Sequence, residues 1–546
     1  MSRLVEDLVH PVTGISLAWG FLPNGSEPMG IGAQTTLALV RAIFIATLAT
    51  LASGPTSRWL ATQRGRARLL AWGLLVVPFF TPTLLISYGM VRFSIALIVS
   101  TWGHEALYVG VLGLKLFPVA VVIRVLLPPP LSAEGCYTYH LAAPASPWSQ
   151  RWFHLRAAGQ GPWIAAGLVF LLAFADFELA SLWSVKTWTM AVFDAQIGGF
   201  ALTDTLRLAA FPFCIQLAVL VALILSRKDS AIGRTESSFP SRFKKPHGAP
   251  TTAAVQTRKI LPLRANPSAH EFASGLKPVR DEAPMAQRSL CAPFKSLCAL
   301  CGKIDFPLWL HRCRAPFLPW LYLAISAAFV TLIPLGIVIV QAIPGVPRLF
   351  ENFVLGRELG ASLLFAVGAT AAAAALVTFT PRSRVPALFL AAPGLFGALT
   401  ISLIVLALFQ VPMLRELYDT PVPLVLALTV LLLPLAFLLG ALWLRQTAPL
   451  YIARQIPSRR LIWELQNRPR AIACAILFCW AWFDFTASSI LAPTGFTPVF
   501  VRLHNLAHYG QTAVLSAMMI AAFATPVAVL LLTGTALHLY ARGHGR

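Results

Sequence analysis

The sequence predicts an all-α protein that crosses a membrane many times and is built from two similar halves in tandem. Hydrophobic residues make up 57% of its 546 residues and charged residues only 12%, and the mean hydropathy is +0.72. Soluble globular chains are much less apolar than this. The apolar residues gather in runs of about 20, the length that a helix needs to cross a hydrocarbon core of about 30 Å. The pattern of runs near the end of the first half returns near the end of the second.

About eleven apolar runs are long enough to be membrane spans. In the first half they cover residues 34–53, 69–90, 106–127, 162–183 and 203–226, and in the second half 318–343, 359–379, 387–409, 421–444, 471–492 and 511–534. The halves are therefore placed at 34–226 and 318–546, after an external tail at 1–33. Residues 227–317 separate them, and the Ser, Pro, Lys and Arg-rich part of this stretch is typical of a cytoplasmic, largely disordered basic linker.

Arginines in the loops predict the orientation of the spans. The loop at 54–68 carries four Arg and no acid, and residues 445–470 carry six Arg against one Glu. Loops enriched in Lys and Arg stay on the cytoplasmic side. With these loops inside, alternation of the spans places the N-terminus outside and the C-terminus inside.

The net charge of +22 does not indicate nucleic-acid binding, because Lys and Arg lie between apolar runs and no recognition motif accompanies them. Eight cysteines in a chain of this length are too few for a disulfide scaffold.

The clearest internal repeat lies in the next-to-last span of each half. AFADFELASLW in the first half corresponds to AWFDFTASSIL in the second, and Asp176-Phe177 aligns with Asp484-Phe485. Both spans cross the membrane in the same direction, so the halves are predicted to be parallel repeats related by an axis along the membrane normal.

A long cytoplasmic loop precedes each of these two spans. The loops read YHLAAPASPWSQRWFHLRAAGQGPW and LYIARQIPSRRLIWELQNRPR, and each has a Pro break followed by a basic and aromatic segment. With these paired loops the chain resembles the fused permease subunits of ABC importers, in particular the iron(III)-type and thiamine-type permeases. In that family the loop forms a coupling helix that docks on a separate ATPase subunit.

The resemblance is carried by particular residues of the two loops. In the first loop these are Ala142, Ala143, Ser146, Pro147, Trp148 and Arg151, and in the second Ala453, Arg454, Arg459 and Arg460. The family's glutamate is absent from both loops, and Pro144 and Pro457 stand where the family has glycine. The other interpretation is that each basic loop anchors its span to anionic lipid.

The resemblance implies a fold, a function and partners. The fold would be two tandem copies of the type I ABC importer permease fold, in the plasma (inner) membrane of a bacterium. Its partners would be a dimer of ATPase subunits, a periplasmic or lipid-anchored substrate-binding protein and the bilayer, and iron(III) or thiamine would be the substrate. The sequence has no G-x-x-x-x-G-K-[ST] motif. We therefore expect a pathway subunit rather than an enzyme, with no cofactor of its own and with ATP bound on the partner.

Two intramembrane acids are the candidate site residues of the pathway. Asp176 and Asp484 lie roughly two thirds of the way across their spans at about 1.5 Å per residue. They either face the translocation path as part of a gate or accept hydrogen bonds that hold the helices together. Glu178 has no counterpart, since Thr486 stands at its position, and we expect it to reach the outer interface.

Two groups of residues are of types that bind metals, but we assign a metal site to neither. His504 and His508 have the spacing of one helix face, but no carboxylate accompanies them. Cys291, Cys298, Cys301, His311 and Cys313 could suit zinc, whereas the apolar IDFPLWL among them is typical of an amphipathic lead-in to the next span.

A second class of function is a secondary transporter driven by an ion gradient, which would use Asp176 and Asp484 as proton or cation sites. A secondary transporter would give no reason for two long basic cytoplasmic loops at matching positions. A membrane-embedded enzyme is disfavoured, because the sequence shows no paired metal-ligand or nucleophile motif.

Overall fold

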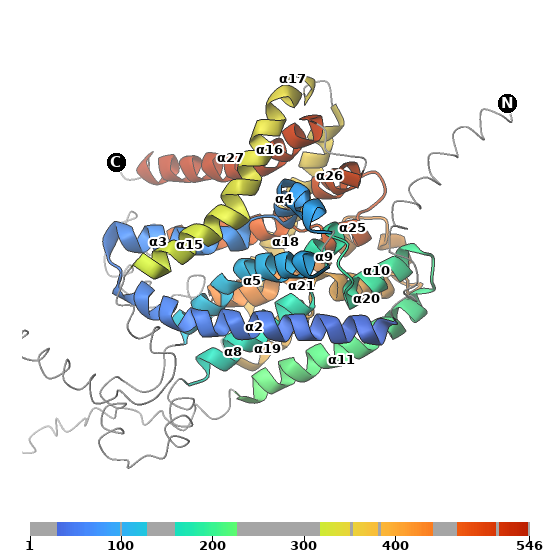
Figure 1. Cartoon of the computed structure of the whole chain (residues 1–546). Helices are drawn as coiled ribbons and strands as arrows, with labels where there is room; N and C mark the ends of the chain where they lie inside the picture. The colour runs from blue at the N-terminus through green and yellow to red at the C-terminus, as the bar shows by residue number, and fades with distance from the viewer. Residues whose placement is uncertain are drawn as a thin grey trace, which may run out of the picture. The chain divides into compact units, whose positions relative to one another are not determined.

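The computed structural model describes residues 30–98, 101–127, 159–226, 317–349, 353–380, 384–440, 467–508 and 513–543. All of them belong to one of the two units into which contacts divide the chain. Every element within these ranges is a helix (Figure 1). The predicted linker lies outside the described residues except for its last residue, and the predicted external tail is described only from residue 30.

The helices follow the predicted order of spans. In the first half they are α2 (Ile31–Thr62), α3 (Gly65–Phe80), α4 (Thr83–Ile98), α5 (Thr101–Leu126), α8 (Gly161–Phe174), α9 (Glu178–Leu182), α10 (Trp188–Ile197) and α11 (Leu202–Ser226). In the second half they are α15 (Phe317–Ala327), η2 (Ala328–Leu332), α16 (Ile333–Ala342), η3 (Ile343–Gly345), α17 (Val346–Leu349), α18 (Phe353–Phe379), α19 (Arg384–Ala391), η4 (Pro393–Phe396), α20 (Ala398–Phe409), η5 (Arg415–Leu417), α21 (Val422–Leu439), α24 (Arg468–Trp482), α25 (Thr486–Leu491), α26 (Val499–His508) and α27 (Ala513–Gly543).

Within the described residues, eight helices are long and apolar enough to cross a membrane, or ten if each of two bent pairs counts as one span. The sequence predicted about eleven spans. The difference is the span predicted at 471–492, which is absent from these candidates among the described residues. α24 in that region has 15 residues.

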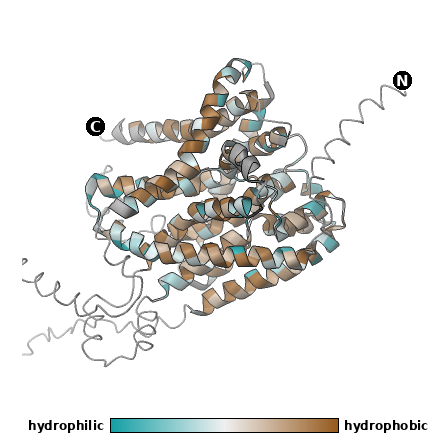
Figure 2. Ribbon diagram, in the orientation of Figure 1, coloured by the Kyte–Doolittle hydropathy of each residue, from teal (hydrophilic) through white to brown (hydrophobic). Residues whose placement is uncertain are grey.

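Small residues let the long helices approach one another closely. Ala38, Ala42, Ala46 and Ala49 recur along one buried face of α2, which packs against α5 and α8. The opposite face of α2 exposes large apolar side chains such as Phe44, and apolar residues predominate along most of the helices (Figure 2). In a bilayer, where burial of apolar surface does not drive helix association, such small-residue faces allow tight packing.

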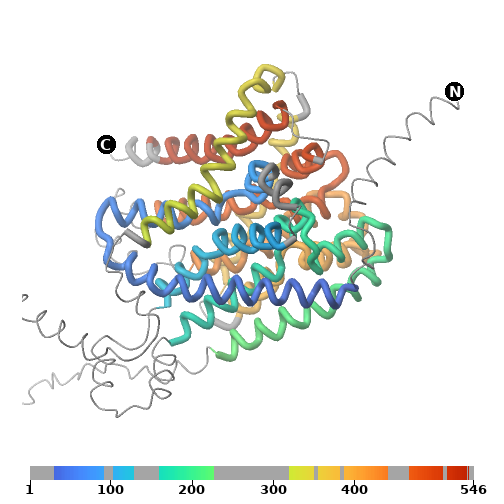
Figure 3. The backbone as a smooth tube through the Cα atoms, viewed as in Figure 1, coloured from blue at the N-terminus to red at the C-terminus, as the bar shows by residue number. Residues whose placement is uncertain are grey.

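Helices of the two halves have matching neighbours. As α2 packs against α5 and α8, α18 packs against α21 and α24, and as α10 packs against α11, α26 packs against α27. The halves also contact each other directly, because α15 lies on α3 and α16 lies on α4, which can be followed along the yellow and blue tube in Figure 3.

Each half contains one sharply bent span. The first is α3 with α4, bent by 81° between Phe80 and Thr83, and the second joins η4 to α20 with a bend of 103°. Gly397 makes the second bend with a φ of +87°, a conformation that glycine adopts at little cost. A Cβ atom on Gly397 would also lie 2.6 Å from the Cβ of Ala175 in the other half, so the bend is a contact point between the halves.

Replacing Gly397 by alanine should therefore destabilise the protein. We expect the Gly397→Ala variant to lose about 2 kcal/mol or more of unfolding free energy, since both the positive φ and the collision with Ala175 cost energy. Thermal unfolding of the purified variant in detergent measures the loss. Gly336→Ala is the matched control, because a Cβ there meets nothing within 4 Å; an equal loss in both variants would contradict the assigned role of Gly397.

Candidate functional site

The two Asp-Phe sequences lie at short breaks in helices, and the first break falls within Gly161–Leu182, which is long and apolar enough to be one span. In the first half α8 ends at Phe174 and α9 begins at Glu178, and in the second α24 ends at Trp482 and α25 begins at Thr486. Asp176 and Asp484 are thus on short non-helical segments. Backbone groups that a break releases must find partners elsewhere, because lipid offers none.

Neighbouring side chains supply partners at the first break. The indole Nε1 of Trp188 donates a hydrogen bond of 2.8 Å to the carbonyl oxygen of Phe174, and Thr189 Oγ1 donates one of the same length to the carbonyl oxygen of Asp176. Both donors lie in the first turn of α10. The packing of α10 beside the break therefore stabilises the interruption of the helix.

The two aspartates hold the short helices that follow the breaks. Asp176 Oδ2 accepts hydrogen bonds from the amide of Ala180 at 3.2 Å and from the hydroxyl of Tyr108 at 3.0 Å. Asp484 Oδ2 accepts from the amides of Ala487 at 3.0 Å and Ser488 at 3.2 Å. The first amides of a helix lack partners within the helix, so each carboxylate satisfies donors that the break exposes. The hydrogen-bonding role considered from the sequence is thus present at both positions.

The breaks meet at the boundary between the halves. The rings of Phe177 and Phe485 are stacked with an interplanar angle of 6° and centroids 6.4 Å apart. Phe177 also packs on Phe193 of α10, and Phe485 packs on the imidazole of His504 at a centroid distance of 4.2 Å. The residues following the two aspartates form an aromatic contact that joins the halves.

Glu178 corrects the sequence-based expectation, because its side chain reaches the other half instead of the outer interface. Glu178 Oε1 accepts hydrogen bonds from the amide of Phe485 at 3.2 Å and from Thr486 Oγ1 at 3.4 Å. Its Oε2 accepts from the hydroxyl of Thr83, at the start of α4. The carboxylate therefore provides a partner for a backbone amide that the second break releases. A comparison of Glu178 with Thr486 alone could not show this role, which depends on packing between the halves.

Several charged and polar residues around the breaks were not singled out from the sequence. Lys115, in the middle of α5, interacts electrostatically with both Glu178 and Asp176. The signal was available, since a lysine inside the apolar run VLGLKLF is expensive in a membrane and so calls for a partner.

An ion pair lies next to this cluster. The guanidinium of Arg41 in α2 pairs with the carboxylate of Glu105 in α5, donates to the carbonyl oxygen of Lys186 at 2.8 Å and lies over the ring of Tyr108. Tyr108 in turn donates to Asp176. Opposite charges near the starts of two predicted spans were the sequence signal for this pair.

The structure describes only some of the other candidate residues. The coupling-loop residues of both halves, and the cysteines and His311 of the zinc alternative, lie outside the described residues. Of the two histidines in α26, His504 stacks on Phe485. No group of three or more His, Cys, Asp or Glu arranged to hold a metal ion occurs within the described ranges.

The apolar helices define the class of the protein, a helical multi-pass membrane protein. Comparisons of the chain with protein-family models, with curated proteins and with solved structures give no match.

The bridging role of Glu178 can be tested by a double-mutant cycle with Thr83. We expect Glu178→Ala to lower the unfolding free energy by about 1–3 kcal/mol, because the amide of Phe485 loses its acceptor. Thr83→Val should cost less, and the two losses should fail to add by roughly 0.5–3 kcal/mol. Unfolding in detergent micelles provides the measurement. Additive losses, or an equal loss in the exposed-acid control Glu416→Ala, would refute the contact.

Proposed function

We propose that the chain is the transmembrane permease subunit of a binding-protein-dependent ABC importer, forming the substrate pathway between its two halves in a bacterial plasma membrane. A separate ATPase dimer would supply the energy. The observation that carries the proposal is the meeting of the two Asp-Phe breaks at the boundary of the halves, where Phe177 stacks on Phe485. A transporter that works by separating two halves needs a contact of this kind that can open.

The matching neighbours of the two halves support a tandem repeat. Both halves pack their helices in the same order, both have one sharply bent span, and both interrupt the next-to-last span at Asp-Phe. The near-parallel Phe177 and Phe485 rings are compatible with a two-fold axis along the membrane normal. The pathway would then follow this axis.

The helices before the breaks can transmit motion from the cytoplasmic side. α8 begins at Gly161 and α24 begins at Arg468, each shortly after a predicted coupling loop, and they have 14 and 15 residues before the breaks. At about 1.5 Å per residue each is roughly 21 Å long. A displacement of the loops by closure of the ATPase dimer would move the far ends of these helices, where the aromatic contact lies.

Polar groups at the breaks would make this contact reversible. Glu178 is bonded to Phe485 and Thr486 across the boundary, and each aspartate is bonded within its own half. Separation of the halves therefore breaks the bonds of Glu178 while the aspartates continue to hold α9 and α25. In this mechanism Asp176 and Asp484 preserve α9 and α25 at the edges of the gate, and the hydrogen bonds of Glu178 break when the gate opens.

A second candidate is a transporter driven by an ion gradient, and one observation favours it. Lys115, Asp176 and Glu178 form a group of opposite charges inside the predicted membrane spans. Such groups carry protons or cations in some membrane transporters. Uptake into proteoliposomes driven by a proton gradient alone, without ATP or an ATPase, would favour this function.

Removing the second cytoplasmic loop tests the coupling to an ATPase. We expect deletion of residues 448–466 to abolish co-purification of the chain with the ATPase encoded beside it, because the coupling segment is lost. A deletion of the same length within the predicted linker, for example 240–258, is the control and should leave co-purification intact. Unchanged co-purification after the loop deletion would contradict the proposal.

Neutralising the aspartates tests their part in the gate. Asp176→Asn and Asp484→Asn keep one oxygen as an acceptor for the helix amides, so both variants should insert and fold. The neutral amide accepts these bonds more weakly than a carboxylate and so holds α9 and α25 less firmly. We therefore expect ATP-driven uptake of the ligand of the co-encoded binding protein to fall roughly tenfold, which corresponds to about 1.4 kcal/mol. Asp204→Asn, at the exposed start of α11, is the matched control. Full uptake in both test variants would exclude the aspartates from the pathway.

A further inference from the structure

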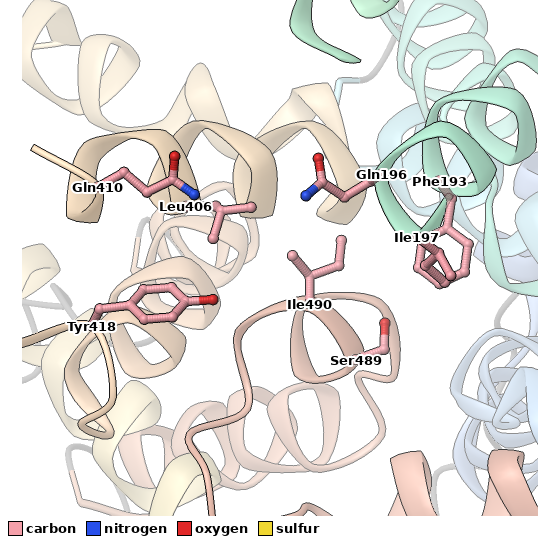
Figure 4. A pocket seen from close by; sticks show the side chains of 8 residues that line it. All are labelled: Phe193, Gln196, Ile197, Leu406, Gln410, Tyr418, Ser489 and Ile490. Carbon is pink, nitrogen blue, oxygen red and sulfur yellow. The ribbon is translucent and has the colours of Figure 1, made fainter. Parts of the chain in front are cut away.

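A pocket lies beside the aromatic contact, between helices of the two halves. It has a volume of about 230 Å³ and is lined by residues of α10 from the first half and of α20 and α25 from the second, with Tyr418 from the segment after α20 (Figure 4). By the predicted orientation these elements lie toward the external side. A solute delivered from outside would meet this pocket before the breaks.

Neutral polar groups converge on the pocket. The amides of Gln196 and Gln410 point toward each other across it, and the hydroxyl of Tyr418 points into the space between them (Figure 4). Gln196 Oε1 is buried and has no hydrogen-bond partner among the described residues. Ser489 donates its hydroxyl to the carbonyl oxygen of Thr486, which leaves its oxygen as an acceptor. The two amides and the Tyr418 hydroxyl offer both donors and acceptors, which suit a ligand rich in hydroxyl or amide groups.

Among the described residues that line the pocket there is no Asp, Glu, Lys, Arg or His side chain. A charged solute would lose its hydration here without gaining an opposite charge, which disfavours a bare metal ion or an organic ion. The ring of Phe193 and the aliphatic side chains offer apolar surface to the faces of a small ring. The volume is below the range of about 300–1,000 Å³ for drug-sized ligands, which limits the occupant to a small molecule.

The pocket is connected to the contact that joins the halves. Phe193 lines the pocket and also packs on Phe177 at a centroid distance of 4.5 Å, and Phe177 is stacked on Phe485. Ser489 lies on α25, the short helix that Asp484 holds. An occupant would therefore touch a residue that supports the aromatic contact from the first half and a helix that supports it from the second.

We propose that this pocket is the substrate-binding site of the pathway and that its substrate class is a small uncharged solute rich in hydroxyl or amide groups, such as a polyol, a single sugar or an acetylated amino sugar. The proposal rests on the proposed function as a transporter. It adds a substrate class, which follows from the uncharged character of the described lining residues and from their hydrogen-bonding groups.

Binding to the purified full-length chain in detergent tests this proposal without any partner. The uncharged probes are glycerol, myo-inositol, glucose and N-acetylglucosamine, and the charged probes are glucose 6-phosphate, glutamate, ferric citrate and thiamine. Thermal stabilisation identifies binders, and equilibrium dialysis gives the dissociation constant. We expect at least one uncharged probe to bind and every charged probe to bind at least tenfold more weakly.

Variants of the two pocket glutamines test whether the probe binds in this pocket. Gln196→Leu and Gln410→Leu should each weaken the binding of that probe at least tenfold, and Gln196→Glu, which retains the size and an acceptor oxygen, should weaken it through its charge. Gln63→Leu, at the end of α2 and outside the pocket lining, is the matched control and should bind as the wild type does. The proposal is wrong if no uncharged probe binds, if binding is indifferent to both pocket glutamines, or if a charged probe binds as tightly in the same pocket.

The two proposals can fail separately. Binding needs neither ATP nor an ATPase, so a chain that binds an uncharged probe but never associates with an ATPase would overturn the importer and leave the pocket assignment standing. A chain that couples to an ATPase but binds none of the uncharged probes would overturn the pocket assignment and leave the importer proposal standing.

Discussion

The need to satisfy backbone groups in the absence of water governs the centre of this protein. Each unpaired amide or carbonyl costs several kcal/mol at membrane depth, so a span can be interrupted only where other groups replace the lost helical bonds. Trp188 and Thr189 provide donors at the first break, and Glu178 provides an acceptor at the second. The position of α10 and the approach of the two halves follow from this requirement, because the breaks cannot exist without these neighbours.

The same interactions concentrate polar and charged groups beside the contact between the two halves. Asp176 and Glu178 flank Phe177, whose ring is stacked on that of Phe485, and both acids interact electrostatically with Lys115. The buried Arg41, paired with the partly exposed Glu105, adds a fixed point between α2 and α5 and, through Tyr108, supports Asp176. Groups that satisfy one another inside a half hold that half together, whereas the bonds of Glu178 run between the halves. In the proposed mechanism, these are the bonds that opening of the boundary would break.

Composition and run length were enough to predict an all-helical, multi-pass protein, since both depend only on the apolar character of the chain. The repeat also led to Asp176 and Asp484, because their sequence context recurs. The breaks at these residues were not predicted, since AFADFELASLW is apolar enough to continue a helix and only the donors of α10 explain why it stops. Glu178 was assigned to the outer interface because its position in the repeat carried no sign of its partners across the halves, Phe485 and Thr486, which are more than 300 positions away in the sequence. Contacts between residues so far apart leave no periodic signal.

The lack of a counterpart to Glu178 has a consequence for assembly. If two copies of the first half faced each other about the same axis, each Glu178 carboxylate would approach the other instead of Thr486, and two like charges would meet in a setting with little water. Two copies of the second half would place Thr486 opposite itself and leave the amides of both breaks without a carboxylate. Only the unlike pair is favourable, so a single chain that carries both halves guarantees the correct partner in every molecule and excludes the two wrong dimers.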